Sequence, residues 1–218
     1  MKISLSRRLA AELLGTSLLV AAVVGSGIMG DRLSAGNAAI ALLANTIATA
    51  AALAALILTF RPISGAHLNP VVSMIEVSAG RLGRGEVCGY MVAQLSGAVL
   101  GTACANVMFA MPAFTLSHRA RSGTPQWFSE FVATFGLILI LRGCARFEPQ
   151  WLPVAVAGYI AAAYWFTAST SFANPAVTIA RSLTDTFSGI RPRDVLPFIA
   201  AQVFGGFSAA FVFDWLAG

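Results

Sequence analysis

Residues 64–71 of this chain are Ser-Gly-Ala-His-Leu-Asn-Pro-Val, and residues 171–176 are Ser-Phe-Ala-Asn-Pro-Ala. Both segments place an Asn-Pro pair, Asn69-Pro70 or Asn174-Pro175, inside hydrophobic sequence. Proline has no amide hydrogen and fixes φ near the helical value, so Asn-Pro indicates a turn or the start of a helix. A helix that begins at membrane depth is tolerated only where its backbone is buried in protein or lines a water-filled cavity. Two such starts in matching positions predict a pore or a site near the membrane midplane.

The composition indicates a membrane protein. Of the 218 residues, 57% are hydrophobic and 11% are charged, and the mean hydropathy is +0.78. An ordinary soluble domain does not have this composition. A transmembrane helix needs about 20 apolar residues. We predict an all-α membrane protein with six transmembrane helices, at residues 9–29, 38–60, 86–109, 127–146, 152–172 and 193–217.

The sequence also contains an internal repeat. Glu12 near the start of the first span matches Glu130 near the start of the fourth, and Gln94 in the third span matches Gln202 in the sixth. The two Asn-Pro pairs fall between these residues in both halves. The offsets between the matched positions are 118, 105 and 108 residues, so the order is kept while loop lengths differ. Self-similarity of this kind fixes the architecture.

Each half contains three predicted spans, so the second half begins on the opposite side of the membrane. The halves, at about 1–115 and 120–218, are therefore predicted to be inverted repeats. Residues 71–79 and 177–183 are too short to cross, and we expect them to form re-entrant half-helices that meet tip to tip near the midplane. Residues 1–218 are predicted to form one channel domain.

The basic residues bear on topology rather than on nucleic-acid binding. The net charge is +5, but Lys and Arg are scattered over short loops and form no stripe. With the N-terminus inside, eight basic residues fall on the inner side and six on the outer side, a weak positive-inside bias. We expect a multi-pass protein of the inner membrane with both termini in the cytoplasm.

The cysteines do not indicate a metal site or a disulfide. Cys88, Cys104 and Cys144 lie in or beside predicted spans without CxxC spacing. We expect no metal, no cofactor and no catalytic residues.

The Asn-Pro motifs predict a specific electrostatic arrangement. Asn69 and Asn174 occupy N-cap positions, where the side-chain oxygen accepts an amide hydrogen from the first turn. The side-chain nitrogen is then free to donate into the lumen. Each helix N-terminus carries about half a positive elementary charge. Two of them at one point repel cations and orient a neutral hydrogen-bonding solute.

Several polar residues in apolar sequence are predicted to support this arrangement. An intramembrane carboxylate is expensive and usually functional. Glu12 and Glu130 could each accept amide hydrogens from the unwound backbone beside a half-helix, although each could also be a juxtamembrane acid near a helix start. Gln94 and Gln202 are expected to form hydrogen bonds between helices. His67 either lines the pore mouth or satisfies a loop carbonyl.

With these motifs, the chain resembles the major intrinsic protein family, the aquaporins and aquaglyceroporins, over essentially its whole length. The resemblance rests on residues 64–71, on the second Asn-Pro-Ala motif and on the repeated Glu and Gln residues. It implies a homotetramer in the lipid bilayer, with one pore per subunit and passive conduction of small neutral solutes.

The chain departs from the family pattern in both motifs. The first motif, Asn69-Pro70-Val71, ends in valine where alanine is usual. The second, Asn174-Pro175-Ala176, is followed by Val177 where the family usually has the arginine of its selectivity filter.

Family spacing places the other three filter residues at Thr49, Ala162 and Ser171. These residues and Val177 are small or medium and uncharged, so we expect a wide, half-apolar pore. Such a pore suits polyols and neutral metalloid hydroxides such as arsenous acid. The chain is also similar to bacterial members associated with arsenic resistance, which implies trivalent or methylated arsenicals as substrates.

Other functions remain open at this level. The first alternative is a water and glycerol facilitator without a metalloid role. The second is an ion-coupled secondary transporter, since inverted repeats and broken helices occur there too. The third is a structural or junction protein. An enzyme is disfavoured because no base–nucleophile pair or metal cluster is visible.

Overall fold

A computed structural model describes residues 3–218, and this part of the chain contains eight helices and no strand. The first half contains α1 (Leu5–Leu33), α2 (Ala38–Ser64), α3 (Pro70–Ser78) and α4 (Val87–Met108). The second half repeats this order with α5 (Thr124–Phe147), α6 (Leu152–Phe166), α7 (Pro175–Arg181) and α8 (Pro192–Ala217). The predicted all-α architecture with two short helices at the Asn-Pro motifs is confirmed.

Five of the helices, α1, α2, α4, α5 and α8, are long and apolar enough to cross a membrane. The sixth, α6, is a shorter apolar helix of 15 residues, which extends about 22 Å at 1.5 Å per residue. The predicted span 152–172 ended six residues too far along the chain. Thr167 leaves the helical conformation, and the chain then runs without helix to Asn174.

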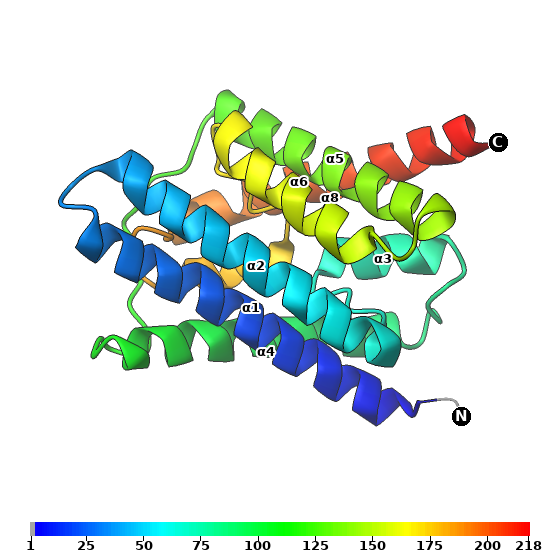
Figure 1. The fold of residues 1–218 in the computed structure, drawn as a ribbon, viewed down its shortest axis with the longest axis horizontal. Helices are drawn as coiled ribbons and strands as arrows, with labels where there is room; N and C mark the ends of the chain where they lie inside the picture. The colour runs from blue at the N-terminus through cyan, green and yellow to red at the C-terminus, as the bar shows by residue number, and fades with distance from the viewer. Residues whose placement is uncertain (1–2) are drawn as a thin grey trace.

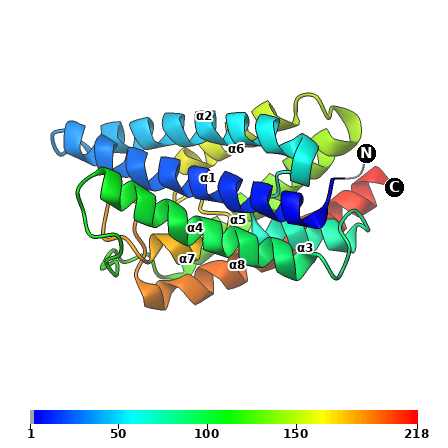
Figure 2. The same cartoon turned by 90° about the horizontal axis from the view of Figure 1, so that it is seen from below.

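The packing follows the repeat. α1 packs against α4 and α2, and α5 packs in the same way against α8 and α6. The half-helix α3 contacts α4 and α8, and α7 contacts α8 and α4, so each half-helix joins both repeats. The two termini lie at the same end of the bundle (Figure 1), with α3 toward that end and α7 toward the opposite end (Figure 2). This arrangement is the predicted inverted repeat.

Glycines allow the main helix pairs to approach closely. A Cβ atom added at Gly97 of α4 would overlap the carbonyl of Leu13 in α1. A Cβ at Gly205 of α8 would overlap the carbonyl of Phe131 in α5. These two glycines hold corresponding places in the two repeats. The same close packing at a small residue therefore joins α1 to α4 and α5 to α8.

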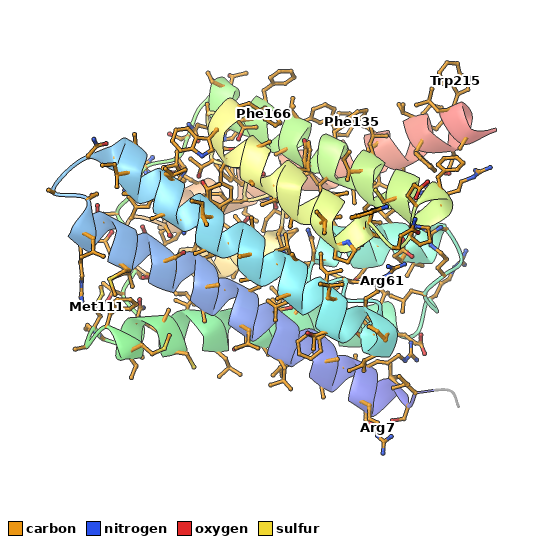
Figure 3. The ribbon with its side chains drawn as sticks, in the orientation of Figure 1. Arg7, Arg61, Met111, Phe135, Phe166 and Trp215 are labelled. Atoms are coloured by element: carbon orange, nitrogen blue, oxygen red, sulfur yellow. The ribbon has the colours of Figure 1, made fainter. Side chains whose placement is uncertain are left out.

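Large apolar side chains cover the outside of the bundle. Phe166 and Trp215 project away from the helices (Figure 3) and are 55% and 76% exposed. Further exposed apolar residues lie on α1, α2, α4 and α8. A soluble monomer does not expose apolar surface on this scale, whereas lipid accommodates it. The chain is an integral membrane protein.

Candidate functional site

The two half-helices meet at their N-termini. Asn69 caps α3 and Asn174 caps α7, with the side-chain Oδ1 atoms accepting from Val71 N at 3.0 Å and from Ala176 N at 3.0 Å. The asparagine side chains also cross between the repeats. Asn69 Nδ2 donates to the carbonyl of Ala173 at 2.8 Å, and Asn174 Nδ2 donates to the carbonyl of Leu68 at 2.8 Å. These reciprocal bonds lock the two tips together.

The crossed bonds correct one detail of the sequence-based expectation. The asparagine amides were expected to be free to donate into the lumen. Each side-chain amide has two hydrogens, and one of them is used between the loops. A single hydrogen on each of Asn69 and Asn174 is left for a solute.

The loops before the half-helices have matching, unusual backbone conformations. Ala66 and Leu68 have φ of 50° and 49°, and Ser171 and Ala173 have φ of 49° at both positions. These positions lie three and one residues before the respective asparagines. Non-glycine residues adopt this left-handed region only when their surroundings impose it. The alternation turns successive peptide groups in different directions, so the loop needs acceptors for its amide hydrogens.

Glu12 supplies the acceptors for the first loop. Its Oε1 accepts from Ser64 Oγ at 2.6 Å and from His67 N at 3.0 Å, and its Oε2 accepts from Leu68 N at 2.7 Å and from Gln94 Nε2 at 2.8 Å. The carboxylate is fully buried. Its structural role is therefore supported by four hydrogen bonds, and the alternative of a juxtamembrane surface acid does not fit.

Glu130 does the same for the second loop. It accepts from Phe172 N and Ala173 N, both at 2.9 Å, and from Gln202 Nε2 at 2.6 Å. Gln202 Nε2 also contacts Thr178 Oγ1 of α7 at 2.9 Å. In the first repeat, Gln94 Nε2 contacts the corresponding residue of α3, Ser73, at 2.9 Å. The two Glu–Gln pairs thus fix a loop and a half-helix in each repeat.

The histidine takes the first of the two roles considered for it, because it lines the lumen, and its ring contacts a hydroxyl rather than a loop carbonyl. The ring Nδ1 of His67 lies 3.0 Å from Ser73 Oγ on α3, and its ring centroid lies 5.1 Å from that of Tyr90. The residue also lines the central cavity. His67 therefore braces the first half-helix while it forms part of the lumen wall.

A cavity of about 320 Å³ runs through the middle of the molecule, past both asparagines. Of the four predicted filter residues, Thr49, Ser171 and Val177 line it. All three are buried, and Ser171 Oγ has no hydrogen-bond partner within residues 3–218. The structure therefore brings three of the four residues to one lumen.

The prediction for Ala162 is wrong. Ala162 is exposed on the outside of α6, and it does not line the cavity. The lining residues of α6 are Leu152, Val156, Ile160 and Tyr164, which recur every four residues on one face. Ala162 is two residues away from Ile160 and Tyr164, about 200° around the helix. Counting without an alignment gave the wrong phase, and Tyr164 takes the place expected for Ala162, with its hydroxyl 3.4 Å from Thr49 Oγ1.

Charged residues line both ends of the cavity. Glu76, Arg81 and Arg61 line it toward the end with the termini, where Glu76 and Arg81 form an ion pair at 2.5 Å (Arg61 is labelled in Figure 3). The sequence does not indicate these three residues. Arg181 lines the cavity at the α7 end, where the i,i+4 spacing from Val177 predicts it, on the same face of the half-helix toward the outer vestibule. Arg121 lies outside the lining, against the same Phe172 ring as Arg181, and no sequence signal indicates that position.

Residues 1–151 match the family model described as "Major intrinsic protein". The chain belongs to the major intrinsic protein family. Its helix order, paired Asn-Pro half-helices and central cavity are those of a channel, and proteins of this family are channels rather than enzymes.

Curated relatives and a solved structure agree with this assignment. The chain is 53% identical to aquaglyceroporin AqpS of Rhizobium meliloti, over 97% of this chain and 91% of the relative. It is 29% identical to a probable aquaporin AqpM of Archaeoglobus fulgidus, over 100% of this chain and 99% of the relative. The crystal structure of the Plasmodium falciparum aquaglyceroporin matches with a TM-score of 0.74 at 20% identity, covering 97% of this chain and 96% of that one, which shows the shared fold.

Replacing Glu130 with glutamine is expected to destabilise this major intrinsic protein. Glutamine keeps one acceptor oxygen, but its amide group would face one of the three donors that Glu130 now accepts from. A buried donor left unsatisfied costs about 1–3 kcal/mol. We expect a lower thermal unfolding midpoint in detergent and a loss of solute flux. Glu148→Gln, at an exposed acid that follows α5, is the matched control and should leave both unchanged.

The cysteines lead to a second expectation. Cys88 and Cys104 are exposed, Cys144 is half-buried, and none of the three lines the cavity. Mercuric chloride should therefore leave glycerol flux through the wild type unchanged, and it should remove most of the flux through Ser171→Cys, with recovery on addition of excess thiol. Strong inhibition of the wild type would show that one of the native cysteines reaches the lumen.

Proposed function

We propose that this protein is a passive channel for small neutral solutes, with a filter formed by Thr49, Ser171, Val177 and Tyr164. Its substrates would be water, glycerol-sized polyols and uncharged arsenicals such as arsenous acid. The observation that carries the proposal is the position of Val177, an apolar side chain in the cavity wall one turn after the tip of α7.

The lumen is suited to a neutral solute with hydroxyl groups. Its polar groups include Ser171 Oγ, which has no partner within residues 3–218, and the remaining amide hydrogens of Asn69 and Asn174. The rest of the lining is largely apolar and includes Leu19, Val72, Leu137, Val156, Ile160 and Val177. A small polyol or arsenous acid can form hydrogen bonds to the polar groups while its apolar flank or central atom contacts the apolar side chains. Tyr164 is bulkier than the Ala162 expected in the filter. The width of the filter therefore depends on its smaller members, Val177 and Ser171.

The hydrogen bonding of the two buried carboxylates argues against the transporter alternative. Ion coupling needs a carboxylate that can bind and release a cation during transport. Glu12 and Glu130 are fully buried and already accept four and three hydrogen bonds from the loops and glutamines. Release of either would unravel the loop that it supports. A passive pore therefore fits these residues better than a coupled carrier.

We also propose a homotetramer in the inner membrane with both termini in the cytoplasm. The termini lie at the same end of the bundle, as an even number of crossings requires (Figure 2). Oligomeric state in native-like lipid discs and protease accessibility of a C-terminal tag in sealed inverted vesicles test these two statements separately.

The function is tested by stopped-flow light scattering on proteoliposomes of known protein density. Water, glycerol, urea and arsenous acid are compared with empty liposomes, with and without an imposed proton gradient. We expect gradient-independent acceleration of glycerol and arsenous acid as well as water. The wide-filter proposal would be contradicted if the protein accelerated only water, or if neither glycerol nor arsenous acid crossed faster than through empty liposomes. Acceleration that needs the proton gradient would support the transporter.

A further inference from the structure

Arg181 has an unusual position in this pore. It is the last residue of α7, four residues after Val177, and both residues line the cavity. Residues four apart lie on the same face of a helix, and Arg181 is about 6 Å farther along the axis. The side chain is 2% exposed, so a guanidinium is buried at the end of the lumen next to the filter.

Two contacts hold the Arg181 side chain in place. Its Nε donates to the carbonyl of Ser188, and its Cζ lies 3.3 Å from the centroid of the Phe172 ring. Ser188 is itself tied to α1, because its Oγ donates to the carbonyl of Val23 at 3.1 Å. Phe172 belongs to the wall of the cavity. These contacts therefore hold the guanidinium at the wall of the lumen.

Arg181 has no ion-pair partner among residues 3–218, where the paired arginines are Arg8, Arg81, Arg142 and Arg191. Glu130, which accepts from Phe172 N, attracts Arg181 only through space. A second arginine contacts the same aromatic ring. Arg121 lies with its Cζ 4.9 Å from the same Phe172 ring, fixed by bonds to the carbonyls of Gly189 and Ser169, both at 2.9 Å.

The repeat makes the asymmetry clear. The residue 105 positions before Arg181, the same offset as between the two asparagines, is Glu76, and Glu76 lines the opposite end of the cavity. Glu76 is neutralised by its ion pair with Arg81, and the half-buried Arg61 is a further cation at that end. The end at Arg181 differs because its cation is fully buried and, among the described residues, no carboxylate lines the cavity there.

We propose that Arg181 is the main cation barrier of this pore, one helical turn from the filter position that Val177 occupies. This arrangement separates two tasks. The filter at Val177 stays wide and uncharged for neutral solutes, and the fixed charge that rejects cations sits beyond it. The proposal rests on the proposed function as a solute channel.

The barrier is tested by measuring potassium and proton leak through proteoliposomes at a clamped membrane potential. The wild type should be as tight as empty liposomes, and Arg181→Gln should leak both ions faster by roughly ten- to a hundredfold, the effect of one unit charge at about 6 Å and an effective dielectric constant of about 20. Arg181→Lys keeps the charge and should stay tight. Arg119→Gln removes an exposed arginine that lies outside the cavity lining and should also stay tight.

Glycerol flux through the same vesicles separates the two proposals. A wild type that does not conduct neutral solutes overturns the proposed function. A glycerol-conducting Arg181→Gln that remains cation-tight overturns the barrier alone. The double variant Val177→Arg/Arg181→Gln returns the charge one turn away and should restore tightness. Arg181→Gln also loses its bond to Ser188 and could fail to fold. In that case the wild type and Arg181→Lys still test the proposal, because cation leak through either would overturn the barrier.

Discussion

Replacing Asn174 with aspartate is expected to turn this solute channel into a cation leak, or to prevent the two halves from closing. Aspartate can cap α7 as asparagine does, because a carboxylate oxygen can accept from Ala176 N and Val177 N. It cannot donate to the carbonyl of Leu68, a bond that is 2.8 Å long in the wild type. Two acceptors would then face each other between the half-helix tips, at a cost of about 1–3 kcal/mol.

The added charge has a larger consequence than the lost bond. The positive ends of α3 and α7 stabilise a carboxylate, so the aspartate would be ionised, and its charge would cancel most of the two half-charges that repel cations. We expect potassium leak to rise by about an order of magnitude or more, which corresponds to about 1.4 kcal/mol or more of lost barrier. Asn69→Asp should behave in the same way, because its contacts to Val71 and Ala173 are equivalent.

The measurement is potassium efflux and glycerol flux on the same proteoliposomes. Asn37→Asp is a matched control, since Asn37 caps α2 through Ala39 N and Ile40 N but has no contact across the repeats. If Asn69→Asp and Asn174→Asp reach the membrane, conduct glycerol like the wild type and remain cation-tight, the half-helix tips add nothing to the cation barrier proposed at Arg181.

Replacing Val177 with arginine is expected to reduce the flux of glycerol and arsenous acid steeply, by about tenfold or more, while water flux falls little. Val177 is buried in the wall of a cavity of about 320 Å³, and a guanidinium there would occupy much of the width available to a solute. The new side chain would also lie one turn from Arg181, and like charges four residues apart on a helix repel each other. The variant is therefore expected to be less stable as well as more selective.

The quantity to measure is the ratio of solute to water permeability at equal protein density in the membrane. Val177→Leu is the control for bulk without charge and should lower the ratio by a smaller amount. An unchanged ratio in Val177→Arg would mean that this position does not set the width of the pore, and the proposed substrate range would lose its main support.

The sequence was most informative where a local pattern of residues is compatible with only one backbone arrangement. Asn-Pro inside apolar sequence begins a helix whatever surrounds it, because proline fixes φ and asparagine caps the first turn. Glu12 and Glu130 were predicted to support the loops because a buried carboxylate needs donors, and the unwound backbone is the nearest source of them. In the structure both carboxylates accept such bonds, Glu12 from His67 N and Leu68 N, and Glu130 from Phe172 N and Ala173 N.

The sequence was least informative where the answer depends on how a regular helix is rotated. Every residue of α6 is apolar, small or aromatic, so the sequence contains no polar stripe that marks the lumen face. Ala162 was selected by counting, and Tyr164 lies on the lumen instead because packing against α2 and α5 sets the rotation. The same holds for Arg121, which packs against the Phe172 ring only because its loop folds in and bonds to Gly189 and Ser169.

By itself, the sequence determined that this chain is a membrane protein built from two inverted halves that meet at paired Asn-Pro half-helices. Local backbone chemistry and the need to satisfy polar groups in lipid impose that result. Only the tertiary structure decided which side chains share the lumen, that each asparagine gives one hydrogen to the opposite loop, and that Arg181 is buried without an ion-pair partner among residues 3–218. The asparagine bonds join residues about 100 positions apart, and no local pattern records such contacts.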